Sequence, residues 1–199
     1  ERFAKALICL LEWVLSQKVS LKLVSMLNKK DAKEMKIMER AFLNIATASL
    51  RLGNYQEAIE YITKVQNSDD LLMQAHAHKT FGSIYLFFLN DAEKAMAACL
   101  KSLKIAEEIS GLEAKGLAAK NYQLLGILQR EWGNLEKAKE YFLASQKIAQ
   151  ENDWHTYEIE NFNELANIFA VSGNPNQALE YHFKALEIAK KHKIEKIYY

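Results

Sequence analysis

Residues 132–138 read Trp-Gly-Asn-Leu-Glu-Lys-Ala, and this short stretch decides the fold. A glycine followed by an asparagine can end one helix and begin the next. Glycine adopts the left-handed backbone conformation at the least cost, and asparagine can accept hydrogen bonds from the first free N–H groups of a helix. Apolar side chains at spacings of three, four and seven lie on both sides of the stretch, as in amphipathic helices. The stretch therefore predicts a helix–turn–helix.

The same turn recurs along the chain. Residues 52–58 read Leu-Gly-Asn-Tyr-Gln-Glu-Ala, residues 172–178 read Ser-Gly-Asn-Pro-Asn-Gln-Ala, and residues 89–95 are a variant, Leu-Asn-Asp-Ala-Glu-Lys-Ala. The final alanines are separated by 37, 43 and 40 residues. A period in this range is typical of a solenoid of stacked helix pairs. The variant has one extra residue between Gly82 and Ala95, which predicts a distorted turn in the second repeat.

Small residues flank the regular turns at fixed distances. They lie seven positions before the turn glycine (Ala46, Gly126, Ala166) and five positions after it (Ala58, Ala138, Ala178). Small side chains allow two helices to approach closely while larger neighbours fill the space above and below. We therefore expect each pair to pack tightly through these positions.

The bulk composition excludes some classes of function. The 26 basic and 25 acidic residues leave a net charge of +1, which gives no general attraction to nucleic acid or to an anionic membrane. One proline and seven glycines favour long helices with short connections. The apolar run from Leu7 to Leu15 is interrupted by Glu12 and is too short to span a membrane. Cys9 and Cys99 are expected to be reduced core thiols in a cytoplasmic protein.

The pattern of small residue, aromatic residue, turn and alanine resembles the tetratricopeptide repeat (TPR). Gly82 with Tyr85, Ala166 with Phe169, and Phe142 after Ala138 all match it. The long repeats of about 40 residues are similar to those of kinesin light chains, spindle-orientation adaptors and bacterial sensor-regulators. The resemblance covers about residues 34–192 and departs from the pattern at Ser49 and Gln129, where an aromatic residue is expected.

The resemblance implies an all-α, right-handed α-solenoid of stacked antiparallel helix pairs, with about ten helices. We expect four TPR-like repeats at about residues 30–67, 68–110, 111–151 and 152–192. Residues 1–29 are expected to form an N-terminal capping helix pair or a degenerate repeat, broken near Ser16 and Gln17. Residues 193–199 would begin a truncated further helix, and both chain ends indicate a fragment of a longer protein.

No residue pattern points to catalysis, a metal ion or a cofactor. His76 and His78 are two positions apart on an expected helix, so their side chains point to different sides. No glycine-rich phosphate-binding loop is present. We therefore expect a protein that is not an enzyme.

The first-choice function is a protein–protein interaction scaffold that binds a peptide or helix of a partner protein in the concave groove of the solenoid. The alternative is a ligand- or peptide-sensing regulatory domain of a larger bacterial transcription regulator. We expect no nucleic-acid or membrane partner, and the oligomeric state stays open. The resemblance places the partner-facing positions on the first helix of each pair, at Arg40, Leu43, Thr47, His76, Lys79, Ser83, Lys120, Gln123, Ile127, Arg130, Glu160, Asn163 and Asn167.

Overall fold

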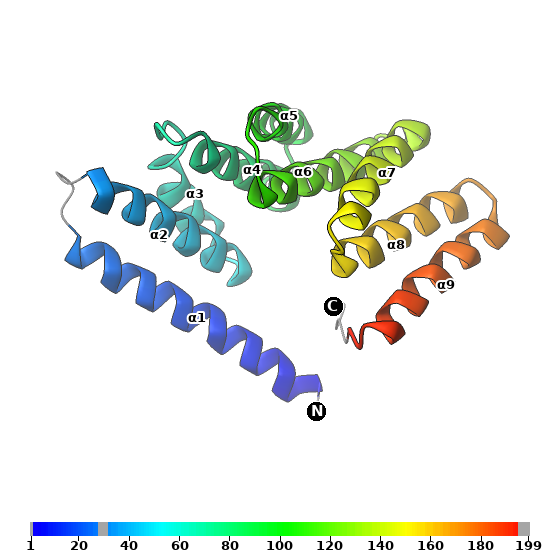
Figure 1. Ribbon diagram of the computed structural model, residues 1–199, viewed down its shortest axis with the longest axis horizontal. Coiled ribbons are helices and arrows are strands. Elements are labelled where there is room, and N and C mark those ends of the chain that lie inside the picture. Colours follow the sequence, from blue (N-terminus) through cyan, green and yellow to red (C-terminus); the bar gives the residue numbers. More distant parts are fainter. Residues whose placement is uncertain (1, 28–31, 195–199) are drawn as a thin grey trace. The chain divides into compact units, whose positions relative to one another are not determined.

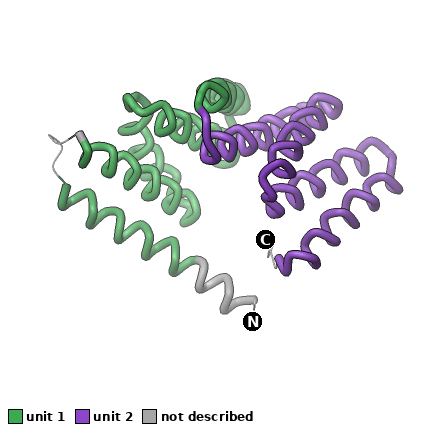
Figure 2. The backbone as a smooth tube through the Cα atoms, viewed as in Figure 1, with its two compact units in different colours: residues 1–109 green, residues 110–199 purple. Residues whose placement is uncertain are grey.

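The computed structural model describes residues 2–27 and 32–194, and the side chains from residue 10 onward except that of Ala32. This part of the chain contains nine α-helices and no strand, which confirms the all-α prediction. The chain divides into two compact units, Glu1–Ile109 and Ser110–Tyr199 (Figure 2). Each unit is a stack of antiparallel helices joined by short turns.

Unit 1 contains the helices α1 (Arg2–Met26), α2 (Ala32–Arg51), α3 (Tyr55–Thr63), α4 (Leu71–Phe87) and α5 (Ala92–Glu108) (Figure 1). Each helix packs against the next, and α2 also contacts α4. Their apolar faces enclose a core that includes Met38, Ile45, Ile62, Val65 and Ile84, all at most 1% exposed.

Helix α1 corrects the prediction of a broken helix pair near the N-terminus. It runs without interruption from Arg2 to Met26. Gln17, at the expected break, lies inside the helix and donates hydrogen bonds to Ser49 Oγ (3.1 Å) and Glu57 Oε2 (2.7 Å). These bonds attach the middle of α1 to α2 and α3, so Gln17 is a packing contact and not a helix break. Residues 28–31, which include the expected boundary near residue 30, lie outside the described residues.

Unit 2 contains α6 (Leu112–Glu131), α7 (Leu135–Glu151), α8 (His155–Val171) and α9 (Pro175–Lys191). Consecutive helices pack against each other. A core cluster of Ala138, Phe142, Leu165 and Ile168 joins α7 to α8. The helices from α2 to α9 form four pairs, one inside each predicted repeat range. The further helix expected from residue 193 falls mostly on residues 195–199, outside the described residues.

The turns between paired helices follow the predicted backbone but not all of the predicted caps. Gly53, Gly133 and Gly173 have φ angles of +79°, +78° and +76°, in the left-handed region. Asn54 caps α3 by accepting a hydrogen bond from the backbone N–H of Glu57. Asn134 and Asn174 make no such cap, which corrects the prediction. The Asn134 amide instead donates to Gln129 Oε1 (2.9 Å), and that of Asn174 to the carbonyl of Ser172 (3.4 Å).

The α4–α5 turn carries the extra residue of the second repeat. In the regular turns the residue after the glycine donates its N–H to the carbonyl five positions before it, as Asn134 does to Gln129. In the α4–α5 turn Asp91 donates to Tyr85, six positions before it. Asn90 takes the left-handed conformation, with a φ of +50°. The insertion is therefore absorbed in the turn, as predicted, and Asp91 still caps α5 through the N–H of Lys94.

Candidate functional site

The predicted partner-facing residues of unit 1 lie on α2 and α4 with different exposures. Arg40 is exposed, and Thr47 is half-buried. Leu43 is only 8% exposed and belongs to the core of unit 1, so it offers little surface to a partner. On α4 the remaining three, His76, Lys79 and Ser83, are half-buried.

The predicted residues of unit 2 are concentrated on one face of α6 and one face of α8. We call this surface the α6–α8 face. The α6 residues are spaced by three, four and three positions, and those of α8 by three and four, so each set lies along one side of its helix. The face consists of Lys120, Gln123, Ile127, Arg130, Glu160, Asn163, Glu164 and Asn167.

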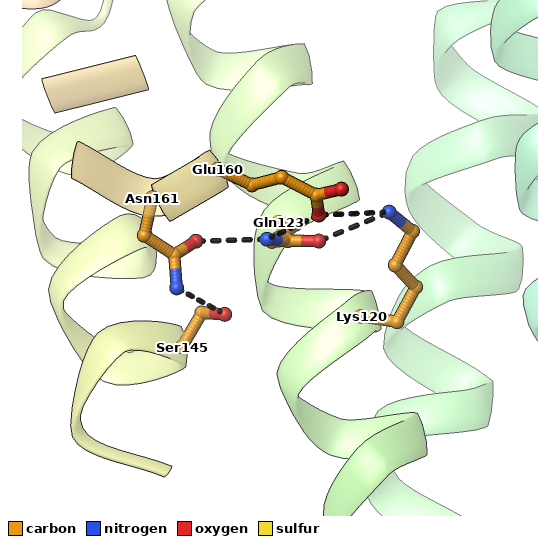
Figure 3. A network of polar contacts seen from close by, with 5 residues as sticks. All are labelled: Lys120, Gln123, Ser145, Glu160 and Asn161. Carbon is orange, nitrogen blue, oxygen red and sulfur yellow. Dashed lines mark hydrogen bonds and ion pairs between the residues drawn. The ribbon is translucent and has the colours of Figure 1, made fainter. Parts of the chain in front are cut away.

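A polar network holds the first part of this face (Figure 3). Gln123 is 4% exposed, and its side-chain amide donates to Asn161 Oδ1 (3.0 Å) and Glu160 Oε2 (3.3 Å) on α8. Its carbonyl oxygen accepts from Lys120 Nζ (3.0 Å). The Asn161 amide, fully buried, donates in turn to Ser145 Oγ on α7 (3.0 Å). Because every bond joins two helices or two turns of α6, the network fixes α6, α7 and α8 together.

Two ion pairs cross the face from α6 to α8. Lys120 Nζ lies 3.8 Å from Glu160 Oε2, and Arg130 pairs with Glu164. All four side chains are 23–40% exposed, so the pairs are partly shielded from water. Lys120 also lies over the ring of Tyr157, at 5.9 Å from its centroid, and burial raises the pKa of that tyrosine. The face therefore presents two cations whose charges are already balanced by carboxylates of the same chain.

The two asparagines complete the face on α8. Asn163 is half-buried, and its carbonyl oxygen lies 3.0 Å from Nδ1 of His182 on α9. Asn167 is exposed one turn further along the helix. Ile127 of α6 is half-buried and packs against the core cluster around Phe142.

Sequence reasoning missed several residues of this arrangement. Asn161 and His182 contact the predicted residues Gln123 and Asn163 from other helix faces, and Ser145 contacts Asn161, so the spacing along α6 and α8 could not indicate them. Glu164 could have been found, because it lies four positions after Glu160 and thus on the same side of the helix.

The described part of the chain holds no group of three or more His, Cys, Asp or Glu side chains that could bind a metal ion. Cys99 is a free thiol, fully buried, and loss of water around it raises its pKa to about 12 despite the nearby charge of Lys79. Cys9 lies where side chains are not described. Within the described residues, no helix has the length and apolar character that crossing a membrane requires.

Several solved structures are similar in fold to this chain, including the following three. The TPR sensor protein of the STAND class (signal transduction ATPase with numerous domains) from Pyrococcus horikoshii superimposes with a TM-score of 0.71 at 20% identity, over 82% of this chain and 25% of that one. MamA from Desulfovibrio magneticus RS-1 superimposes with a TM-score of 0.58 at 18% identity, over 92% of this chain and 97% of MamA. BtubC from P. vanneervenii superimposes with a TM-score of 0.56 at 13% identity, over 96% of this chain and 94% of BtubC. At such low identities, the superpositions show a shared fold and nothing more. This chain spans only a quarter of the STAND protein.

No curated protein sequence matches the chain significantly. A family model described as "Tetratricopeptide repeat" does match it, over residues 39–70, 75–109 and 119–152, which together make up half of the chain. The matched segments cover α3, α5 and α7 entirely and most of α2, α4 and α6. These helices carry the turns and small residues that define the repeat. The chain belongs to the tetratricopeptide repeat family.

Proposed function

We propose that this protein is an interaction module that binds a peptide segment of a partner protein, and that the peptide lies on the α6–α8 face. The observation that carries the proposal is a buried polar network beneath two asparagine amides at the surface. A buried network holds α6, α7 and α8 in place, while Asn163 and Asn167 present side-chain amides at the surface. A surface held in its binding geometry before the partner arrives loses less conformational entropy on binding.

The charge arrangement favours recognition of the peptide backbone over recognition of acidic groups. A carboxylate of the partner would have to compete with Glu160 for Lys120 and with Glu164 for Arg130. Uncharged asparagine amides can hydrogen-bond the peptide backbone, Asn163 through its NH2 group and Asn167 through either end of its amide. Ile127 supplies an apolar contact between the two ion pairs. The peptide would therefore be an extended segment with few charges.

The test is a screen of a displayed peptide library against the protein. The comparison variant is Asn163→Ala with Asn167→Ala, which removes both surface amides and leaves the buried network intact. A matched control, Lys147→Ala with Glu187→Ala, removes two exposed polar side chains from α7 and α9. We expect native and control proteins to select the same peptides and the double asparagine variant to lose them. Equal selection by all three proteins would place binding on another surface.

A separate binding surface within unit 1 is proposed at the equivalent residues of α2 and α4, which are Arg40, Thr47, His76, Lys79 and Ser83. The same screen with Lys79→Ala and Ser83→Ala tests that surface. A cytoplasmic location is also proposed, since Cys99 is a free, buried thiol, which is compatible with a reducing compartment.

The second candidate is a regulatory domain that senses a peptide or small ligand. It is supported by the similarity in fold to a STAND protein whose TPR part is a sensor. Sequencing the gene on both sides of the segment that encodes residues 1–199 tests this candidate. An adjoining ATPase or DNA-binding domain would favour the sensor over a free-standing scaffold.

A further inference from the structure

His182 departs from the repeat pattern at a position that otherwise belongs to the core. The residue four positions after the alanine that ends each turn sequence is Ile62 in α3, Cys99 in α5 and Phe142 in α7. Each of these is 0% exposed. In α9 the same position is His182, which is polar and exposed. A specific contact of His182 accounts for a polar side chain at this position.

That contact is Asn163, in the middle of the α8 side of the α6–α8 face. Asn163 Oδ1 lies 3.0 Å from His182 Nδ1. A carbonyl oxygen can only accept a hydrogen bond, so this contact is a hydrogen bond when His182 Nδ1 carries the hydrogen and donates it. The bond links α8 to α9 and sets which end of the Asn163 amide faces outward.

The equivalent residue of the preceding repeat shows what is different at Asn163. Gln123 lies 40 positions earlier, and both ends of its amide are used inside the protein, by Lys120 on one side and by Glu160 and Asn161 on the other. At Asn163 the carbonyl oxygen is used by His182, and the NH2 group has no hydrogen bond to any residue that the structure describes. Asn163 therefore directs its oxygen toward His182 and offers its NH2 donors.

We infer that His182 is a positioning residue that fixes Asn163 as a hydrogen-bond donor, so that the bound segment must place a backbone carbonyl oxygen against it. This inference rests on the proposed function of the α6–α8 face. It adds a residue of α9 to that face and states the polarity of the contact. Without the His182 bond, the Asn163 amide could turn over and present its oxygen instead, which would repel a carbonyl.

The first test uses the free protein and needs no partner. Nitrogen-15 NMR of the histidine rings reports which ring nitrogen of neutral His182 carries the hydrogen. We expect the hydrogen on Nδ1, and we expect the Asn163 side-chain NH2 signals to shift in His182→Phe, which keeps a ring but removes the donor. A hydrogen on Nε2 alone would mean that Nδ1 accepts from the Asn163 amide, and this result would overturn the inference.

The second test measures the Kd of a synthetic peptide selected by the native protein in the library screen. Loss of one neutral hydrogen bond predicts that His182→Phe weakens binding roughly 3- to 10-fold, with partial recovery in His182→Gln, which restores a donor. Asn163→Asp keeps the acceptor for His182 but replaces the outward donors, so we expect a loss of at least about 10-fold. Glu187→Gln, also exposed on α9, is the matched control and should bind as the native protein does.

The outcomes separate this inference from the proposed function. Native affinity in a folded His182→Phe variant would overturn the positioning role and leave peptide binding intact. A library screen in which the native protein selects no peptide would overturn the proposed function and the recognition of a carbonyl. The ring-nitrogen measurement would still decide whether His182 fixes the Asn163 amide.

Discussion

The ring of Phe142 on α7 occupies the space in which a side chain at residue 126 of α6 would begin. A Cβ atom built on Gly126 would lie 2.8 Å from Cζ of Phe142 and 2.9 Å from both Cε atoms. Phe142 is 0% exposed and packs in the core cluster of unit 2, so its ring has little room to move. The close approach of α6 and α7 therefore depends on the missing side chain at Gly126.

We expect Gly126→Ala to destabilise unit 2 by about 1–3 kcal/mol, because the added methyl group overpacks the contact with Phe142. Urea unfolding followed by circular dichroism measures the change. Gly116→Ala is the matched control on the same helix, since its Cβ would lie at an ordinary 3.6 Å from Trp154. Removing a glycine from a helix without a clash should be neutral or stabilising, by up to about 1 kcal/mol. Equal effects of the two substitutions would contradict this account of α6.

Ala138 is the second small residue of the same helix pair. It is 0% exposed and lies in the cluster with Phe142, Leu165 and Ile168. Ala138→Leu should force α7 away from its neighbours at a cost of about 1–3 kcal/mol. Ala170→Leu, at an exposed position of α8, adds the same atoms without a clash and should change the free energy of unfolding by less than about 0.5 kcal/mol. A native unfolding midpoint in Ala138→Leu would show that the position is not a tight contact.

Gln146 on α7 is a polar residue that the core does not satisfy. It is 4% exposed, and neither its amide nitrogen nor its amide oxygen has a hydrogen-bond partner among the residues that the structure describes. Leucine occupies the equivalent positions of α5 and α9, Leu103 and Leu186, whereas the first repeat has Gln66, which lies after the end of α3. We expect Gln146→Leu to stabilise unit 2 by about 1–2 kcal/mol, because two buried polar atoms are replaced by apolar ones.

The comparison for Gln146 is Asn161→Leu, which removes a buried amide that does have partners. Asn161 accepts from Gln123 and donates to Ser145, so its loss leaves both of those groups with a missing bond. We expect a destabilisation of about 1–3 kcal/mol. Equal destabilisation by the two leucine substitutions would contradict the idea that their effects depend on whether the buried amide has hydrogen-bond partners.

The repeat pattern predicted most of the fold because it depends on residues that are close together in the sequence. Glycines in the left-handed region, small residues at helix contacts and the extra residue of the α4–α5 turn all follow from short-range spacing. The continuous α1 was missed because the role of Gln17 depends on Ser49 and Glu57, more than 30 residues away. The predicted cap at Asn134 failed for a local reason, since its side-chain amide donates to Gln129, five residues earlier, and its oxygen makes no bond to the start of α7.

The candidate site was predicted less completely than the fold. Helical spacing brings Lys120, Gln123 and Glu160 to one face, and the structure shows them in contact. Whether a side chain on α6 can reach a partner protein depends on its contacts with α8, and the spacing of residues along α6 does not predict those contacts. Gln123 is buried under α8, and Arg130 is paired with Glu164 for this reason. The partner-facing role of these residues stays a prediction that the peptide screen tests.

The end of unit 2 contains a stacked histidine pair that makes a prediction about pH. The rings of His155, at the start of α8, and His192, just after α9, lie 3.5 Å apart between centroids. His155 Nδ1 is 2.9 Å from Glu158 Oε1. The pKa of His192 is lowered, first by loss of water around the ring and then by the positive charges of His155 and Lys191. The carboxylates of Glu158 and Asp153 raise this pKa, but by less.

A lowered pKa in the folded state means that folding favours neutral His192. The unfolded chain would take up a proton near pH 6.5, the ordinary value, before the folded protein does. The stability contributed by the pair should therefore be complete above pH 6.5 and decline as the pH falls below it. Proton NMR titration should place the pKa of His192 below 6.5 in the native protein and closer to 6.5 in His155→Phe, which keeps a ring but removes the charge. A native His192 that titrates at or above 6.5 would contradict this account, as would a His192→Phe variant whose unfolding midpoint falls with pH as steeply as that of the native protein.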